Sequence, residues 1–132
     1  MATPVISFSD FQKLDIRIGT VVEAVVPEWS HWVMKLTVDL GPEIGERTVF
    51  AGIMKFYNPQ DLIGKQFVFV VNLEPKKIGP KESDGTQGYS QAMLLAAIRP
   101  LEKPIEVEAE KITEKPIPLA PSAIVPNGAK IR

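Results

Sequence analysis

Apolar and polar residues alternate most strictly between positions 33 and 40 of the chain. The apolar positions of this segment are Met34, Leu36, Val38 and Leu40, and the polar ones are Lys35, Thr37 and Asp39. Because the side chains of a β-strand point alternately to its two faces, this period predicts a strand with one buried face. The same pattern predicts a second strand over residues 47–53, with Val49, Ala51 and Ile53 inward.

Three further segments are predicted as strands. Residues 66–73 are apolar on both faces up to Asn72, which predicts a central strand covered on both sides. Residues 92–98 predict the fifth strand, and residues 15–26, with a bend or bulge at Gly19-Thr20, predict the first. The predicted inward side chains of that first strand are Ile16, Ile18, Val22, Ala24 and Val26.

Two short helices complete the predicted core. Ser7 and Asp10 have the spacing of a helix N-terminus, and this helix is predicted to end near Leu14. A helix so short must pack against something, either the barrel or a second subunit. Its apolar anchors are Ile6, Phe8 and Phe11. Residues 41–45 predict a turn, and residues 58–64 predict a second short helix. Five strands with a short helix between the third and fourth predict a mainly β protein, a five-stranded OB-fold barrel.

The chain is predicted to be a single domain over residues 1–132, with its core at 14–100 and a C-terminal β extension at 101–132. Residues 102–118 are charged and punctuated by proline, so by composition this stretch could be a mobile excursion. Residues 117–119 and 129–131, with a turn at 126–128, predict short strands that return to the body of the protein.

Composition narrows the class of protein. The 132 residues include no cysteine, which excludes disulfides and thiolate chemistry and fits a cytoplasmic protein. No apolar run reaches the roughly eighteen residues of a membrane span, and the first residues lack the features of a secretory signal. The formal net charge of −1 gives no overall attraction for nucleic acid. Residues 55–99 nevertheless carry six basic against four acidic side chains, which permits a modest nucleic-acid face.

Catalytic and metal-binding patterns are absent from the sequence. His31 is the single histidine, and zinc sites normally need three or four ligands. No phosphate-binding loop, nucleophile elbow, zinc-protease motif or dinucleotide fingerprint occurs. We therefore expect no metal, no cofactor and no enzymatic activity of the chain itself.

Two pairs of residues are candidates for binding. Trp29 and Trp32 crowd the loop after the first strand, where OB-folds often hold unpaired bases on aromatic side chains. The favoured interpretation is that the indoles seal an end of the barrel or a dimer contact, and the alternative is stacking or peptide contact. Lys76 and Lys77 follow the fourth strand at a predicted barrel mouth, where they are either solvated or in contact with phosphate.

Several segments, in register along the chain, carry a resemblance to a known family. They are residues 6–19, 52–57 and 62–65, the stretch Asn-Leu-Glu-Pro-Lys-Lys-Ile at 72–78, Ser-Gln-Ala-Met-Leu-Leu-Ala-Ala at 90–97, and residues 125–131. They resemble the tRNA-binding domain family, which includes the C-terminal domain or separate β subunit of methionyl-tRNA synthetase and free-standing tRNA-binding proteins.

The resemblance implies an OB-fold homodimer that binds tRNA by its shape. It also implies that the N-terminal helix and the C-terminal extension help to build the dimer. Ser90 and Met93 match the Ser-x-x-Met of the family, and Lys76 and Lys77 match its basic pair. The predicted RNA-binding set is Lys55, Lys76, Lys77, Ser90, Met93 and Arg99.

The chain departs from the family pattern in three places. Residues 28–32 replace the usual first loop, and residues 102–115 are an acidic elaboration. The loop at 79–88 is longer than usual and carries Glu82 and Asp84. We expect this loop to hold the lysine pair apart from the Ser-x-x-Met. A sister branch, the CsaA-type chaperones, shares the fold and dimer but generally lacks that motif.

The sequence thus predicts a cytoplasmic, non-catalytic tRNA-binding protein. It stands alone or serves as the β subunit of methionyl-tRNA synthetase, so its expected partners are tRNA, a second copy of the chain and the synthetase. One alternative is a CsaA-like homodimeric chaperone that holds unfolded or export-bound proteins near Trp29 and Trp32. Another is a purely structural dimerisation appendage of a synthetase.

Overall fold

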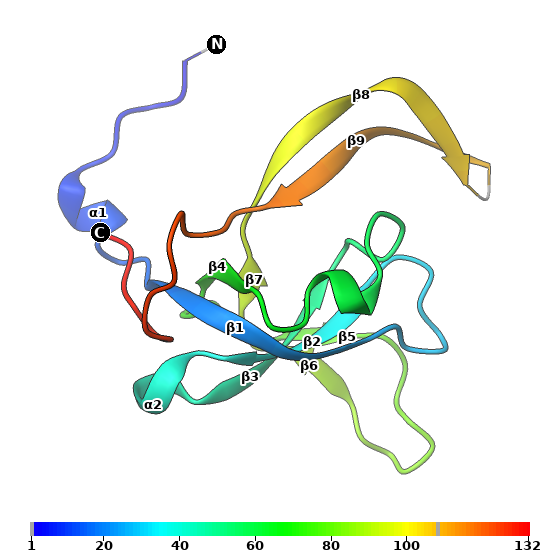
Figure 1. Ribbon diagram of the computed structural model, residues 1–132, viewed down its shortest axis with the longest axis horizontal. Coiled ribbons are helices and arrows are strands. Elements are labelled where there is room, and N and C mark those ends of the chain that lie inside the picture. Colours follow the sequence, from blue (N-terminus) through cyan, green and yellow to red (C-terminus); the bar gives the residue numbers. More distant parts are fainter. Residues whose placement is uncertain (1, 108) are drawn as a thin grey trace.

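A five-stranded antiparallel sheet, coiled into a nearly closed barrel, forms the centre of the protein (Figure 1). The computed structural model describes residues 2–107 and 109–132. The helices are α1 (Phe8–Phe11), α2 (Gly41–Ile44) and the 3-10 helix η1 (Pro59–Asp61). The strands are β1 (Ile16–Val25), β2 (Met34–Asp39), β3 (Glu46–Ala51), β4 (Gln66–Val70), β5 (Lys76–Ile78), β6 (Gly88–Ser90), β7 (Met93–Leu94), β8 (Ala96–Val107) and β9 (Glu110–Pro118). The barrel strands run in the order β3-β2-β1-β4-β7, which confirms the predicted OB-like barrel.

The gap between the edge strands β3 and β7 is bridged just before β7. The Gln91 backbone N–H donates to the Thr48 carbonyl oxygen at 2.8 Å, and the Gln91 side-chain oxygen accepts from the Thr48 N–H at 2.8 Å. Ser90 adds a further link, because its hydroxyl oxygen accepts from the Phe50 N–H at 3.0 Å. Few backbone groups of the β3 edge are thus left for pairing with another chain.

The inward-facing residues predicted from the strict alternation along β2 and β3 are confirmed. Met34, Leu36, Val38 and Leu40 are fully buried, and so is Val49 of β3. Strand β4 lies between β1 and β7 in the sheet and is buried along most of its length, as its continuous apolar sequence predicted. The predicted turn at 41–45 is a single helical turn, α2.

The alternation predicted along β1 is wrong at two positions in its second half. Val22 is 44% exposed and Val26 is 40% exposed, whereas Val21 is fully buried and Ala24 is buried as predicted. The pairing with β2 runs from Val21 opposite Val38 to Glu23 opposite Thr37, so Val22 is an extra residue and the strand bulges there. A bulge shifts every later side chain to the other face.

The predicted bend at Gly19 has a different explanation. A Cβ atom at Gly19 would lie 2.6 Å from a methyl carbon of Val38 and 2.7 Å from one of Leu40. Glycine therefore allows β1 to cross β2 closely at this point, and the irregularity in pairing comes two residues later.

The fifth predicted strand divides in two. Strand β7 completes the barrel beside β4, and β8 then leaves the barrel and pairs with β9 in a long ribbon that arches away from it (Figure 1). The suggestion from composition that residues 102–118 form a mobile excursion is wrong. Instead, β8 and β9 pair with each other from Ala96 opposite Pro118 to Val107 opposite Glu110. The pairing is interrupted between Pro100 and Ile105.

The last residues return to the barrel, as predicted. The Ile18 N–H donates to the Ala129 carbonyl oxygen at 2.9 Å, and the Ile131 N–H donates to the Ile16 carbonyl oxygen at 2.8 Å. The Asn127 side-chain oxygen accepts from the Thr20 hydroxyl at 2.7 Å. These bonds add a short C-terminal segment to the free side of β1.

Helix α1 lies at the outside of the barrel, beside the C-terminal segment (Figure 1). The Ser7 hydroxyl accepts from the Asp10 N–H at 3.1 Å, which confirms the predicted cap. None of the α1 residues is buried, and Phe8 is 71% exposed. In the part of the chain that the structure describes, no helix is long and apolar enough to cross a membrane.

Candidate nucleic-acid interface

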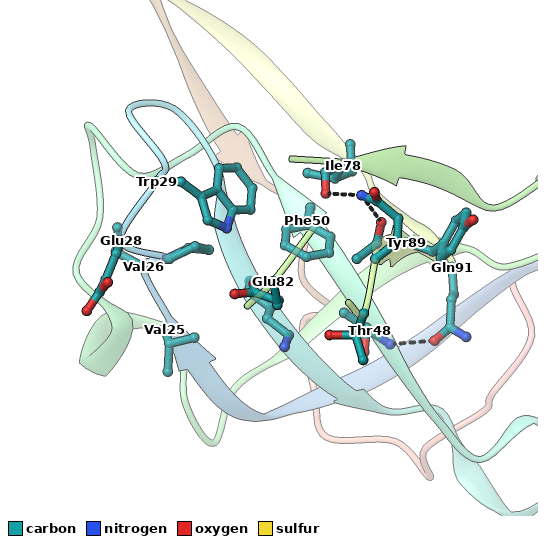
Figure 2. Close-up of a pocket in the computed structure, with 15 residues that line it drawn as sticks. Val25, Val26, Glu28, Trp29, Thr48, Phe50, Ile78, Glu82, Tyr89 and Gln91 are labelled. Carbon is teal, nitrogen blue, oxygen red and sulfur yellow. Dashed lines mark hydrogen bonds between the residues drawn. The ribbon is translucent and has the colours of Figure 1, made fainter. Parts of the chain in front are cut away.

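A groove crosses the outer surface of β2 and β3 between two loops (Figure 2). One wall is the loop at 26–33, which joins β1 to β2, and the other is the segment at 72–92, which joins β4 to the fifth barrel strand, β7. The groove encloses about 720 Å³. OB-folds bind oligonucleotides and oligosaccharides between these two loops and over these two strands, so this groove is the candidate site.

The β5–β6 hairpin forms the second wall of the groove and carries the predicted lysine pair. Lys76 pairs with Ser90, and Lys77 pairs with Tyr89. The expectation that the 79–88 loop holds the lysines apart from Ser90 is therefore wrong. The loop folds back as the tip of a hairpin, and the ladder brings the two motifs into register across two strands.

The Ser90 hydroxyl is engaged within the protein. It accepts from the Phe50 N–H at 3.0 Å and donates to the Ala92 carbonyl oxygen at 3.1 Å. Its oxygen thus fastens β6 to β3 and its hydrogen is used within the segment that leads to β7, which explains why a serine is suited to this position. A direct hydrogen bond from Ser90 to RNA stays a prediction.

Met93 lies on β7 opposite Val70, and 47% of its surface is exposed. The sequence analysis missed a basic residue near it. Arg47, at the start of β3 opposite the buried Val38, donates to the Val71 carbonyl oxygen at 2.6 Å and lines a depression with Asn72, Pro75 and Gln91 at the start of the hairpin segment. A charged residue in phase with the inward-facing Val49 and Ala51 was the available signal.

Lys55 and Arg99 lie at a different place, near the base of the β8–β9 ribbon. The Lys55 ammonium stands 5.1 Å from the centre of the Trp32 ring. Arg99 pairs across the ribbon with Lys115, whose ammonium stands 5.1 Å from the centre of the Tyr57 ring. The six predicted RNA-binding residues therefore form two groups, Lys76, Lys77, Ser90 and Met93 on the hairpin side, and Lys55 and Arg99 beside the ribbon.

Trp29 and Trp32 also lie in different parts of the molecule. Trp29 lines the groove, with its ring 6.2 Å from that of Phe50 and tilted by 38° (Figure 2). It packs against Gly79, where a Cβ atom would lie only 2.4 Å from the indole and where φ is +72°. Trp32 instead lines a depression beneath the ribbon with Ile98 and Ile112. Trp29 therefore packs the loop at 26–33 against the hairpin, and the roles predicted for the two indoles stay predictions.

The loop at 79–88 brings negative charge to the groove. Glu82 lines it, and Asp84 lies two residues further along the tip. Hydrogen bonds from the Thr86 hydroxyl and backbone N–H lower the pKa of Asp84, so this carboxylate stays charged at neutral pH. This loop therefore opposes phosphate binding near the groove, while the lysine pair on the same hairpin favours it.

A five-stranded barrel of this kind, with an aromatic groove between its first and fourth connections, defines an OB-fold binding protein. The sequence also shows to which family of OB-fold proteins the chain belongs. Residues 16–120 match the family described as "Putative tRNA binding domain", and the chain belongs to this tRNA-binding domain family.

Known relatives agree with this assignment. The chain is 47% identical over 94 residues to a methionine–tRNA ligase of Methanothrix thermoacetophila and 42% identical over 108 residues to one of Methanococcoides burtonii. The matches cover 71% and 82% of this chain but only 13% and 15% of the two ligases. The chain is thus homologous to one region of much longer enzymes.

Two solved structures resemble the whole chain. One is the chaperone CsaA from Bacillus anthracis, with a TM-score of 0.73 and 33% sequence identity. The other is a MetRS-related protein from Pyrococcus horikoshii, with a TM-score of 0.73 and 32% identity. Each comparison covers 98% of this chain and 100% of the other. Both branches anticipated from the sequence are therefore represented among the structural neighbours.

Proposed function

We propose that the chain binds tRNA without catalysing a reaction on it, either alone or as an accessory subunit of methionyl-tRNA synthetase. The observation that carries the proposal is the position of Lys76 and Lys77 on a hairpin that forms one wall of the OB-fold groove, in a member of the tRNA-binding domain family. Both lysines are exposed and so are available to phosphate. Because tRNA is a cytoplasmic ligand, the proposal includes a cytoplasmic location.

The test is a titration with bulk tRNA at several salt concentrations. Lys76→Ala with Lys77→Ala is expected to weaken binding and to reduce the slope of log K against log salt by about 2, because each phosphate contact contributes about 0.9. Lys103→Ala with Lys111→Ala is the matched control, since it removes the same charge from exposed positions of the ribbon. Equal salt slopes for the two double variants would contradict the proposal.

The synthetase partnership is tested separately. The methionine–tRNA ligases that resemble this chain contain the matching region within a single long polypeptide. If this chain supplies that region from outside, it should co-elute with a methionyl-tRNA synthetase that lacks such a region. Elution of the chain alone would favour a free-standing protein, and co-elution without any tRNA binding by the chain would favour a structural appendage.

A second candidate function has its own support. The CsaA structure, 33% identical over nearly the whole chain, is described as a chaperone. Trp32, which is 44% exposed, would suit contact with unfolded protein on the side of the molecule where the sequence predicted it. Two results would favour the chaperone over the tRNA-binding protein. The wild-type chain would suppress the aggregation of a reduced, unfolded protein, and it would bind tRNA no more tightly than the Lys76→Ala, Lys77→Ala variant does.

A homodimer belongs to the same proposal. Ile6, Phe8 and Phe11 are the predicted contact residues, and the rings of Phe8 and Phe11 stack on each other 6.4 Å apart. Phe8 presents most of its surface to solvent in the single chain, which a second copy would cover.

A further inference from the structure

One polar atom in the wall of the groove is left without a partner by the fold. Among the side-chain nitrogen and oxygen atoms of the described residues, the Trp29 indole nitrogen is shielded from water and makes no hydrogen bond. The neighbouring Ser30 differs, because its hydroxyl donates to the Val33 carbonyl oxygen at 2.7 Å and accepts from the Val33 N–H at 2.8 Å. An indole N–H can only donate, so Trp29 requires an acceptor that this loop does not supply.

Packing fixes the direction of this N–H. The six-membered ring of Trp29 presses on Gly79 at the start of the hairpin loop, and its ring system lies against that of Phe50. Rotating the indole toward solvent would break both contacts and separate the loop at 26–33 from the hairpin. The donor is therefore held in the wall of the groove (Figure 2).

The rest of the groove suits a flat, polar ring system. Its aromatic lining consists of Trp29, Phe50 and Tyr89, and Tyr89 is 44% exposed. Its volume of about 720 Å³ lies within the range of roughly 300–1,000 Å³ that holds small ligands. Unpaired bases stack on aromatic side chains, and each of the four bases carries acceptor atoms that an N–H can reach.

A phosphate group next to such a base would meet a cation. Lys35, from β2, is a cation in the lining of the groove. Ile78 and Gly88 form the hairpin pair that lies against Phe50, so Lys77, next to Ile78 in the strand, is on the other face of the hairpin.

We propose that this groove holds one unpaired nucleotide of the bound tRNA, with the Trp29 indole N–H donating to an acceptor on its base and Lys35 at its phosphate. The inference rests on the proposed tRNA-binding function and deepens it, since it adds a base contact to recognition by shape. Trp29 belongs to the loop in which this chain departs from the usual pattern of its family.

Access to the donor requires a movement of the groove wall. The nitrogen is shielded in the unbound chain, and Glu82 and Thr86 of the 79–88 loop line the groove on the opposite side from Trp29's own loop. The tip of this loop is folded on itself, because the Glu82 N–H donates to the Thr86 carbonyl oxygen at 2.7 Å and the Gly85 N–H to the Glu82 carbonyl oxygen at 2.9 Å. The proposal therefore includes a displacement of this tip when the nucleotide enters.

The first experiment leaves Trp29 unaltered. The chain has two tryptophans, so Trp32→Phe makes Trp29 the single indole fluorophore. Its emission is titrated with bulk tRNA, with a short single-stranded RNA and with the same sequence as a duplex. Saturable quenching by tRNA and by the single strand, and little by the duplex, is expected because only unpaired bases can enter. Unchanged emission at saturating tRNA would overturn the inference.

The second experiment removes the donor together with one ring of the indole and keeps an aromatic side chain. Trp29→Phe is expected to weaken tRNA binding about three- to tenfold, the usual range for one hydrogen bond, without changing the salt slope. Tyr57→Phe is the control and should bind as the wild type does, since it removes an aromatic donor that bonds to the Pro116 carbonyl oxygen and does not line the groove. Wild-type affinity of a folded Trp29→Phe variant would refute the base contact.

The two hypotheses fail in different ways. If the wild-type chain does not bind tRNA, the proposed function fails and this inference fails with it. If the wild type binds and the Lys76→Ala, Lys77→Ala variant binds more weakly, but Trp29 neither changes its emission nor affects affinity, then the base contact alone is wrong.

Discussion

At the scale of single residues, Arg17 joins parts of the chain that local sequence does not connect. It is only 4% exposed, yet it donates to the Asp15 carboxylate at 2.8 Å and to the Glu43 carboxylate at 2.9 Å. It also reaches the Gly128 carbonyl oxygen at 3.4 Å. A buried cation is tolerated here because its donors meet carboxylates that remain partly in water.

These bonds make stability depend on pH. Hydrogen bonds from Arg17 lower the pKa of both Asp15 and Glu43 from their ordinary values of 3.8 and 4.5. Since the folded-state pKa is the lower one, the unfolded chain binds more protons. The stabilisation is complete above the ordinary values and is lost as pH falls through the folded-state values.

Arg17→Met should expose this dependence. We expect it to destabilise the fold by about 2 kcal/mol near neutral pH, because two carboxylates lose their donor. We also expect a flatter loss of stability below about pH 4.5 than in the wild type, since the carboxyl pKa values return toward their ordinary range. Urea unfolding midpoints measured between pH 3 and 7 check both effects. Parallel curves for the two proteins would show that Arg17 does not set these pKa values.

Residue-scale pairings were the least predictable part of the site. Lys76-Lys77-Ile78 and Gly88-Tyr89-Ser90 are strands of three residues each, too short to show a period. Their pairing depends on how the loop between them folds back, so the sequence could place both motifs near one mouth but could not place Lys76 opposite Ser90. The partner of Arg17, 26 residues away, is likewise invisible to local patterns.

At the scale of elements, the β5–β6 hairpin combines opposite charges. Its strands carry Lys76 and Lys77, and its tip carries Glu82 and Asp84. The tip shapes one wall of the groove, so the same element both attracts and repels a polyanion. Its net effect on tRNA depends on which end of the hairpin lies nearer the phosphates.

Neutralising the tip tests this balance. Glu82→Gln with Asp84→Asn should strengthen tRNA binding about two- to fivefold at low salt, because repulsion from two carboxylates is removed while the side-chain oxygens are kept. Asn at 84 can still accept from Thr86, so the turn should persist. Binding titrations at low and high salt give the measurement, and the gain should shrink as salt rises. Glu102→Gln with Glu106→Gln, on β8, is the control.

Elements with strong alternation were predictable, and those whose form depends on distant pairing were not. β2 and β3 followed their two-residue period, and β4 followed its continuous apolar run. The β1 bulge was missed because an extra residue in one strand is defined by its partner strand. The β8–β9 ribbon was missed because its charged, proline-containing sequence resembles a disordered segment, although mutual pairing satisfies most of its backbone.

At the scale of the whole molecule, two of the regions with exposed apolar side chains lie outside the barrel. One surrounds α1 with Val5, Ile6 and Phe8, and the other lies on the ribbon with Ile98 and Ile105. The ribbon arches away from the barrel, while α1 lies beside the C-terminal segment (Figure 1). The proposed homodimer would cover at least the first of these regions.

Phe8→Asp tests the dimer. In the single chain Phe8 is 71% exposed, so the substitution should change the stability of an isolated subunit by less than about 0.5 kcal/mol. A charge in a dimer contact would instead shift the chain toward monomer, which sedimentation velocity across a range of concentrations measures. Ile63→Asp, an exposed apolar position at 44%, is the control and should leave the association unchanged. Identical sedimentation of wild type and Phe8→Asp would place the contact elsewhere.

The C-terminal segment that completes the free side of β1 has a consequence for the kinetics of folding. Arg17 and Gly128, which it brings together, are 111 residues apart in the chain. Pairing across such a sequence separation raises the contact order, and high contact order slows folding. We therefore expect the first half of β1 to meet the C-terminal segment only after most of the sheet has assembled. Folding of this protein should be limited by the meeting of its two ends rather than by the formation of its hairpins.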